Sequence, residues 1–278
     1  MEGSEVVDVI ALTSMDPSWR TVGAGDFDSD GTTDILLYDD DSGTARIWLL
    51  GDFAGDGKFD IQLAAGWVVA GIGDFNGDGR GEIAIWNRSA RLEIWGLQGE
   101  LVRLARISIR QHWEIAGFGD IDGDGDDDII IQDRRKRKIG ATLMSADFST
   151  QQVVLDKQRT ALWDIIDSGD YDGDGQSDLL WRDLSWGAPG SAGVWHLSSD
   201  LELTGNPVEL NLDIDHSVVG SADYDGDGSA DLLVFNPATR ELVLWLMADG
   251  GAHRFVSLGT VAADWLPAGF NTDDAAVQ

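Results

Sequence analysis

The chain contains no cysteine, only 5 prolines in 278 residues, and no long apolar run. Without cysteine it has neither a disulfide framework nor a thiolate nucleophile. No apolar stretch approaches the roughly 20 residues of a membrane-spanning helix. Residues 1–12 show no basic region followed by an apolar one, so no signal peptide is visible. The sequence therefore predicts no membrane insertion.

Basic residues are also scarce, because 19 Lys and Arg face 50 Asp and Glu for a formal net charge of −31. Binding to a nucleic-acid backbone needs clustered Lys and Arg, so this charge argues against it. The hydrophobic content of 43% is that of a folded protein rather than of an acidic disordered tail. The 35 glycines and 12 tryptophans are typical of tight turns between strands that bury large aromatic side chains.

The chain repeats itself at an interval of about 50 residues, which is the spacing of a repeat architecture. Five complete segments and a partial sixth align, and they start at Trp19, Trp67, Trp113, Trp163, His216 and Trp265. We expect the whole chain, residues 1–278, to form a single domain built from these units.

Each unit reads as four short β-rich runs without helical periodicity. In the first unit these runs are residues 21–24, 35–38, 45–50 and 59–65. Four such runs in about 50 residues predict an all-β protein, a β-propeller with one four-stranded blade per repeat. A solenoid of strands is the competing architecture, but its repeats are usually shorter, at about 20–30 residues.

The number of blades stays open at this point. Residues 6–12 look like a fourth strand with no blade before it, and residues 265–270 look like a first strand with no blade after it. Five complete units with these orphan strands are compatible with five blades, with an incomplete sixth blade, or with a piece of a longer array.

An acidic loop recurs between the first and second runs of each complete unit. Counted from its first Asp, it carries an acid or Asn at position three, Asp at five, Gly at six, a variable residue at seven and an acid at nine. The candidate metal ligands at positions one, three, five, seven and nine are Asp26, Asp28, Asp30, Thr32 and Asp34; Asp74, Asn76, Asp78, Arg80 and Glu82; Asp120, Asp122, Asp124, Asp126 and Asp128; Asp170, Asp172, Asp174, Gln176 and Asp178; and Asp223, Asp225, Asp227, Ser229 and Asp231.

This spacing predicts one calcium ion in each loop, about five in all. Calcium takes six to eight oxygen ligands, and alternate residues of a tight loop can direct carboxylates at one centre. Position seven can vary because its backbone carbonyl would be the ligand. An EF-hand is excluded, because position twelve is apolar and lies in a β-like run rather than being a bidentate Glu. Ordinary metal-free turns are the alternative interpretation, since Asp and Gly favour turns.

The repeats resemble the FG-GAP/VCBS-type repeats found in integrin α-subunit propellers and in bacterial surface proteins. Residues 67–86 and the segment LVLWLM at 242–247 carry the closest match. The resemblance implies a β-propeller with calcium in the hairpin between the first two strands of each blade. It implies function poorly, because the family spans adhesins, lectins and appendages of enzymes. His216, Asn76 and Glu82 depart from the pattern, and the sixth unit lacks the loop.

Three segments outside the repeat pattern carry open alternatives. Residues 52–60, DFAGDGKFD, resemble another calcium loop but are also compatible with a plain turn. The basic residues 134–138 are compatible with docking to an acidic partner or with a solvated turn. The loop 184–193 carries Trp186, which is a candidate for a sugar or protein contact or for packing onto its own blade.

No catalytic motif is visible, and the four histidines form no motif, so we expect a protein that is not an enzyme. The first hypothesis is a calcium-binding propeller that mediates adhesion or protein–protein interaction, outside the cell or on its surface. The alternative is a carbohydrate-binding lectin with sites between the blades. A polysaccharide-acting enzyme is the third hypothesis. The expected partner is a protein or a glycan.

Overall fold

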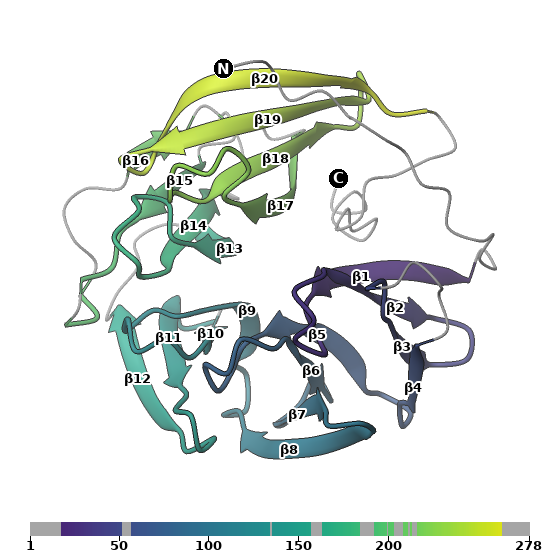
Figure 1. Ribbon diagram of the computed structural model, residues 1–278. Helices are drawn as coiled ribbons and strands as arrows, with labels where there is room; N and C mark the ends of the chain where they lie inside the picture. The colour runs from purple at the N-terminus through teal and green to yellow at the C-terminus, as the bar shows by residue number, and fades with distance from the viewer. Residues whose placement is uncertain are drawn as a thin grey trace.

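The computed structural model describes residues 18–51, 57–133, 135–156, 163–183, 192–198, 200–202, 208–210, 212 and 216–262. These residues contain twenty strands in five four-stranded antiparallel sheets, and they contain no helix. Figure 1 shows the five sheets arranged around a central axis as a five-bladed β-propeller. The predicted all-β propeller is confirmed. The orphan segments 6–12 and 265–270 lie outside the described residues.

Each blade contains four consecutive strands in sequence order, with the first strand nearest the axis (Figure 1). Blade one contains β1 (Trp19–Gly25), β2 (Asp34–Asp39), β3 (Thr44–Trp48) and β4 (Lys58–Gln62). Blade two contains β5 (Val68–Gly73), β6 (Glu82–Trp86), β7 (Arg91–Leu97) and β8 (Leu101–Ser108). Blade three contains β9 (Glu114–Gly119), β10 (Asp128–Asp133), β11 (Lys138–Leu143) and β12 (Gln151–Asp156). Blade four contains β13 (Trp163–Gly169), β14 (Asp178–Asp183), β15 (Ala192–Trp195) and β16 (Val208–Leu210), and blade five contains β17 (Ser217–Ala222), β18 (Asp231–Asn236), β19 (Glu241–Ala248) and β20 (Gly251–Thr260).

The second strand of each blade is largely buried, because it is covered by the neighbouring blades. All six residues of β10 are buried, whereas most of the outer strand β20 is exposed. A strand covered on both faces needs apolar residues at consecutive positions. This burial explains why the second runs read as Ile, Leu and Val without alternation.

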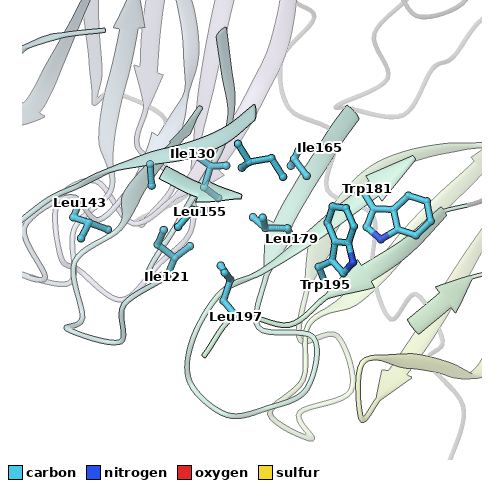
Figure 2. Close-up of a cluster of buried hydrophobic side chains, with 11 residues drawn as sticks. Ile121, Ile130, Leu143, Leu155, Ile165, Leu179, Trp181, Trp195 and Leu197 are labelled. Carbon is cyan, nitrogen blue, oxygen red and sulfur yellow. The ribbon is translucent and has the colours of Figure 1, made fainter. Parts of the chain in front are cut away.

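The hydrophobic core consists of four separate layers in the described residues, one between each pair of consecutive blades from one to five. Figure 2 shows the layer between blades three and four, a cluster that includes Ile130 of blade three and Leu179, Trp181 and Trp195 of blade four. Trp67 packs against the layer between blades one and two in the same way. The blades therefore depend on their neighbours for burial of their apolar faces.

Each inner strand contains an irregularity in its pairing with the second strand, and the residue that follows is a glycine in four of the five blades. In blades one to three this glycine makes room for the next blade. A Cβ on Gly23 would lie 2.8 Å from Cδ1 of Ile72, and a Cβ on Gly71 would lie 2.5 Å from Cε2 of Phe118. The inner strands approach one another closely because these positions have no side chain.

In blade four the equivalent position is Asp167, and the residue that faces it from blade five is Ser221. A small hydroxyl side chain replaces the bulky residues found at this position in blades two and three. Burial raises the pKa of Asp167, while hydrogen bonds from the Ser221 side chain and the Ser168 backbone N–H lower it. Between blades four and five this contact therefore pairs a carboxylate with a hydroxyl group instead of a glycine with an apolar side chain.

The substitution Gly71→Ala is expected to destabilise the protein by about 1–3 kcal/mol, because the added methyl group would overlap the Phe118 ring in a packed interface. Urea unfolding would measure this change. In a Phe118→Ala background the same substitution should cost markedly less, since the ring is gone. Equal costs in the two backgrounds would contradict the proposed close contact.

Candidate metal centres

Each acidic loop joins the inner strand of a blade to its second strand, as predicted. The position-one carboxylate organises the turn by accepting backbone N–H groups. In loop three, Asp120 Oδ1 accepts from Gly123 N at 2.7 Å and Asp120 Oδ2 accepts from Gly125 N at 2.9 Å. The bond from position six to position one recurs in all five loops at 2.8–3.0 Å. Gly125 has a φ of 94°, a value that favours glycine.

The position-nine carboxylate ties the loop to the carboxyl end of the third strand of its own blade or to the residues that follow it. Asp128 is fully buried, accepting from Ile121 N at 3.1 Å through Oδ2 and from Met144 N at 2.7 Å through Oδ1. The same pair of bonds recurs at position nine in loops one, four and five. The sequence predicted an acid here as a ligand but did not reveal this second role.

Carboxylate oxygens from positions one, three and nine converge within 4.8 Å of one another in three loops. These groups are Asp26, Asp28 and Asp34; Asp120, Asp122 and Asp128; and Asp223, Asp225 and Asp231. Loop four instead gathers Asp170, Asp172 and Asp174, and it places Asp172 and Asp178 beside His196. These groups have ligand atoms close enough to hold a metal ion.

The position-five carboxylates stabilise the turn by accepting a backbone hydrogen bond. Asp30 Oδ1 accepts from Thr32 N at 2.7 Å, and the equivalent bond from position seven to position five recurs in every loop. In loops one, three and five, position five is not part of the three-acid groups found in the described residues. At position seven, Arg80 Nε donates to Ser29 Oγ at 2.7 Å and so joins loop two to loop one.

Glu82, an irregular residue at position nine of loop two, keeps the hydrogen bond to the loop backbone that the position-nine acid makes elsewhere. Its Oε2 accepts from Phe75 N at 3.0 Å, the bond that the shorter Asp makes in other loops. A Cβ on Gly96 would lie 3.4 Å from Cγ of Glu82 and 2.6 Å from Cδ1 of Leu104. The contact with Glu82 would be an ordinary van der Waals contact, so it is Leu104 that leaves no room for a side chain at position 96.

Burial raises the pKa of the position-nine acids. The pKa of Glu82 and of Asp128 rises to about 8 in each case, chiefly because burial penalises the charged form and also because other loop acids lie nearby. Burial likewise raises the pKa of Asp34 and Asp231. A bound cation would relieve both effects.

Loop three gives the clearest test of whether the residues present fit a cation. Asp122 Oδ1 is buried and has no hydrogen-bond partner among the described residues. Burial, together with the charges of Asp124 and Asp120, raises the pKa of Asp122. A buried acceptor without a donor is costly, and an ion coordinated by oxygen would satisfy it. The donor set of this loop fits a hard divalent cation such as calcium.

Hydrogen bonds also join the loops of consecutive blades from one to five. The position-eight N–H donates to the position-one carbonyl of the preceding loop. These bonds run from Gly81 to Asp26 at 2.8 Å, from Asp127 to Asp74 at 2.7 Å, from Ser177 to Asp120 at 2.6 Å and from Ala230 to Asp170 at 2.6 Å. The loops therefore form a continuous row at one end of the propeller, and an ion in one loop would also brace its neighbour.

Residues 52–56 of the possible sixth calcium loop lie outside the described residues. At the described end of that segment, the Asp60 carboxylate is an acceptor in a pair of hydrogen bonds from Arg46, at 2.6 Å each. Of the basic segment 134–138, Arg134 lies outside the described residues and Lys136 lies 4.0 Å from Asp133. Residues 184–191, including Trp186, also lie outside them. In the part of the chain that is described, no helix is long and apolar enough to cross a membrane.

The fold and the loops define a β-propeller with a repeated acidic hairpin. The family model of the FG-GAP-like repeat matches residues 74–131, from the start of loop two into β10. This match confirms the resemblance found in the sequence. A search of curated proteins finds no match.

Among solved structures, a protein from Lactobacillus plantarum superimposes with a TM-score of 0.54 and 13% identity, over 82% of this chain and 68% of that one. The Tc holotoxin pore of Photorhabdus luminescens gives a TM-score of 0.48 and 17% identity, over 88% of this chain and 12% of that one. A quinonprotein alcohol dehydrogenase-like protein from Bacteroides thetaiotaomicron gives a TM-score of 0.47 and 9% identity, over 90% of this chain and 68% of that one. At these identities the likeness to the Lactobacillus plantarum protein shows the fold alone.

Proposed function

We propose that the chain is a calcium-binding, non-catalytic β-propeller that presents its surface to a protein partner outside the cell. The observation that carries this proposal is the convergence of three acids in each of loops one, three and five. In each of these groups the position-nine acid is fully buried and has a raised pKa. A folded protein retains such groups when a cation compensates their charge.

Calcium fits these loops better than a transition metal. The converging groups in loops one, three and five offer only carboxylate oxygens, which suit hard cations. The bound ion would neutralise the loop and stabilise the folded state. The protein's own residues would do the rest, with position one shaping the turn and position nine linking the loop to the third strand. Weak repeated sites of this kind suit the millimolar calcium found outside cells.

An interaction role, rather than catalysis, is supported by the acids themselves, which are engaged in the architecture of the loops. A described cavity lined by Arg110, Trp113 and Gln152 has a volume of about 30 Å³. It has room for about one water molecule, far less than the 300–1,000 Å³ of a typical small-ligand site. The FG-GAP-like match is consistent with a protein-interaction role. A glycan array tests the carbohydrate-binding alternative.

Native mass spectrometry of the full chain, with and without added calcium, tests the proposal. We expect about five calcium ions per chain, one per acidic loop. Asp120→Asn should remove one ion, whereas Asp147→Asn, outside the loops, should remove none. A folded chain that takes up no calcium would contradict the metal assignment.

The interaction role is tested separately on the calcium-loaded protein. A glycan array and a screen against surface proteins would distinguish the two partner classes. Specific calcium-dependent binding to a protein supports the proposal. Binding to glycans alone would replace it with the lectin alternative, and turnover of a polysaccharide would replace it with an enzyme.

A further inference from the structure

Loop four differs from the other loops because a histidine reaches into it. His196 directly follows β15, and its Nδ1 lies 3.0 Å from Asp178 Oδ2 and 3.1 Å from Asp172 Oδ2. All three ligand atoms lie within 4.8 Å of one another. The Asp178 side chain is 1% exposed, so one carboxylate of this group is inside the protein.

The histidine is specific to blade four. In blades one, three, four and five, one backbone N–H after or near the end of the third strand donates to the position-nine acid. In blade four this N–H belongs to Leu197, and His196 is the residue immediately before it. The equivalent residues in blades one, three and five are Leu49, Leu143 and Leu246. A leucine cannot coordinate a metal, so these three blades provide an internal reference for what the imidazole adds.

The arrangement of the acids changes with it. In loops one, three and five the position-nine acid converges with positions one and three. In loop four Asp178 meets Asp172 and His196 instead, while Asp172 also belongs to a second group with Asp170 and Asp174. The loop thus gathers a mixed group of one nitrogen and two oxygen ligands, which shares Asp172 with an oxygen-only group.

The neighbouring blade fixes the position of the imidazole ring. A Cβ on Gly250 would lie 2.1 Å from Cε1 and 2.2 Å from Nε2 of His196, so only a glycine allows the β19–β20 turn to pass over the ring. The turn is anchored by a hydrogen bond from Gly250 N to Tyr171 O at 3.0 Å. Side chains held in this way lose little freedom when they bind a ligand, which favours binding.

We propose that Asp172, Asp178 and His196 form a site for a divalent transition-metal ion, with Zn²⁺ as the best match. Imidazole nitrogen and carboxylate oxygen are common zinc ligands, whereas calcium takes oxygen. Tetrahedral bonds of about 2.0–2.1 Å place neighbouring ligand atoms about 3.3 Å apart. The distances from His196 Nδ1 to the two carboxylate oxygens are 3.1 Å and 3.0 Å, so they need to lengthen by only a few tenths of an ångström. The inference rests on the proposed function for the ligand role of the loop acids, and it changes the cation in one loop.

The test is zinc retention by the full chain in the presence of excess calcium, measured by native mass spectrometry. We expect the wild type to retain one Zn²⁺ together with calcium in the other loops. His196→Leu, which installs the residue of blades one, three and five, should bind zinc at least about tenfold more weakly, since even outer-shell substitutions cost 10- to 100-fold. His253→Leu, on the exposed strand β20, should retain zinc like the wild type.

Cobalt provides a second measurement at the same site. Co²⁺ bound by the wild type should show the visible absorption of a tetrahedral nitrogen- and oxygen-ligated ion, and His196→Leu should lose that absorption. His196→Gln serves as a second variant in case the leucine variant does not fold. Equal zinc retention by the wild type and a folded His196 variant would overturn the proposal, as would a wild type that keeps calcium and no zinc. Loss of calcium binding in every loop would instead count against the proposed function.

Discussion

Removing calcium is expected to lower the melting temperature of the protein by at least about 10 °C. An ion that binds only the folded state stabilises it by RT ln(1 + [L]/Kd), about 1.4 kcal/mol per site at tenfold excess over Kd. Five such sites contribute about 7 kcal/mol, and each kcal/mol shifts the melting temperature of a domain of this size by about 2–4 °C. Thermal unfolding followed by circular dichroism, in calcium and in chelator, measures the difference.

Added magnesium is the matched control for this measurement. Magnesium prefers a rigid octahedron with several waters, so it should restore much less of the lost stability than calcium does. Titrating calcium back should raise the melting temperature steadily as the sites fill. A melting temperature that is the same in chelator and in calcium would show that the loops are turns without a structural ion.

Asp34→Ala is expected to be the most damaging single substitution in loop one. Asp34 is fully buried, and its carboxylate accepts hydrogen bonds from Phe27 N at 3.1 Å and Leu50 N at 2.8 Å. Leaving two buried N–H groups without an acceptor costs about 1–3 kcal/mol each, or about 2–6 kcal/mol together. The variant should also bind one calcium fewer.

Thr32→Ala in the same loop is the control. Position seven varies among the loops, and its predicted ligand is the backbone carbonyl, which the substitution keeps. Its effect on stability should stay within about 0.5 kcal/mol, with no change in the number of bound ions. Urea unfolding should show a larger cost of Asp34→Ala in calcium than in chelator, because burial raises the pKa of Asp34 and disfavours its charged form when no cation is present. Similar effects of the two substitutions would contradict the assigned roles.

The row of loops and the layers of core give the same picture of how the propeller holds together. Each blade buries its apolar faces only against its neighbours. Loops two to five each donate to the preceding loop through a backbone hydrogen bond, such as the one from Ser177 N to Asp120 O. A cation that orders one loop therefore acts at two blades, and loss of calcium should weaken contacts between blades as well as within them.

The sequence by itself determined the repeat, the strand content and the loop that carries the acids. These properties are local, because a run of apolar residues or an Asp-Gly turn sets its own conformation over a few residues. The period near 50 residues then selected the propeller. The positions of Asp120, Gly125 and Asp128 in the turn followed from their spacing alone.

Only the tertiary structure decided what those acids contact across longer separations. The bond from Met144 N to Asp128 spans 16 residues, and the contact of His196 with Asp178 spans 18. Pairing registers and blade packing bring such residues together, and no local pattern encodes their distance. The four histidines formed no motif in the sequence for this reason, and the mixed group around His196 became visible only once β14 and β15 were paired.

The matched contacts between blades were likewise hidden in the sequence. Gly71 and Phe118 lie 47 positions apart by residue number, and only the packing of one inner strand on the next makes the glycine a requirement. Asp167 and Ser221 show the same contact with different chemistry. Steric fit between blades depends on the assembled ring, so local propensities fixed the blade while the tertiary structure decided how the blades meet.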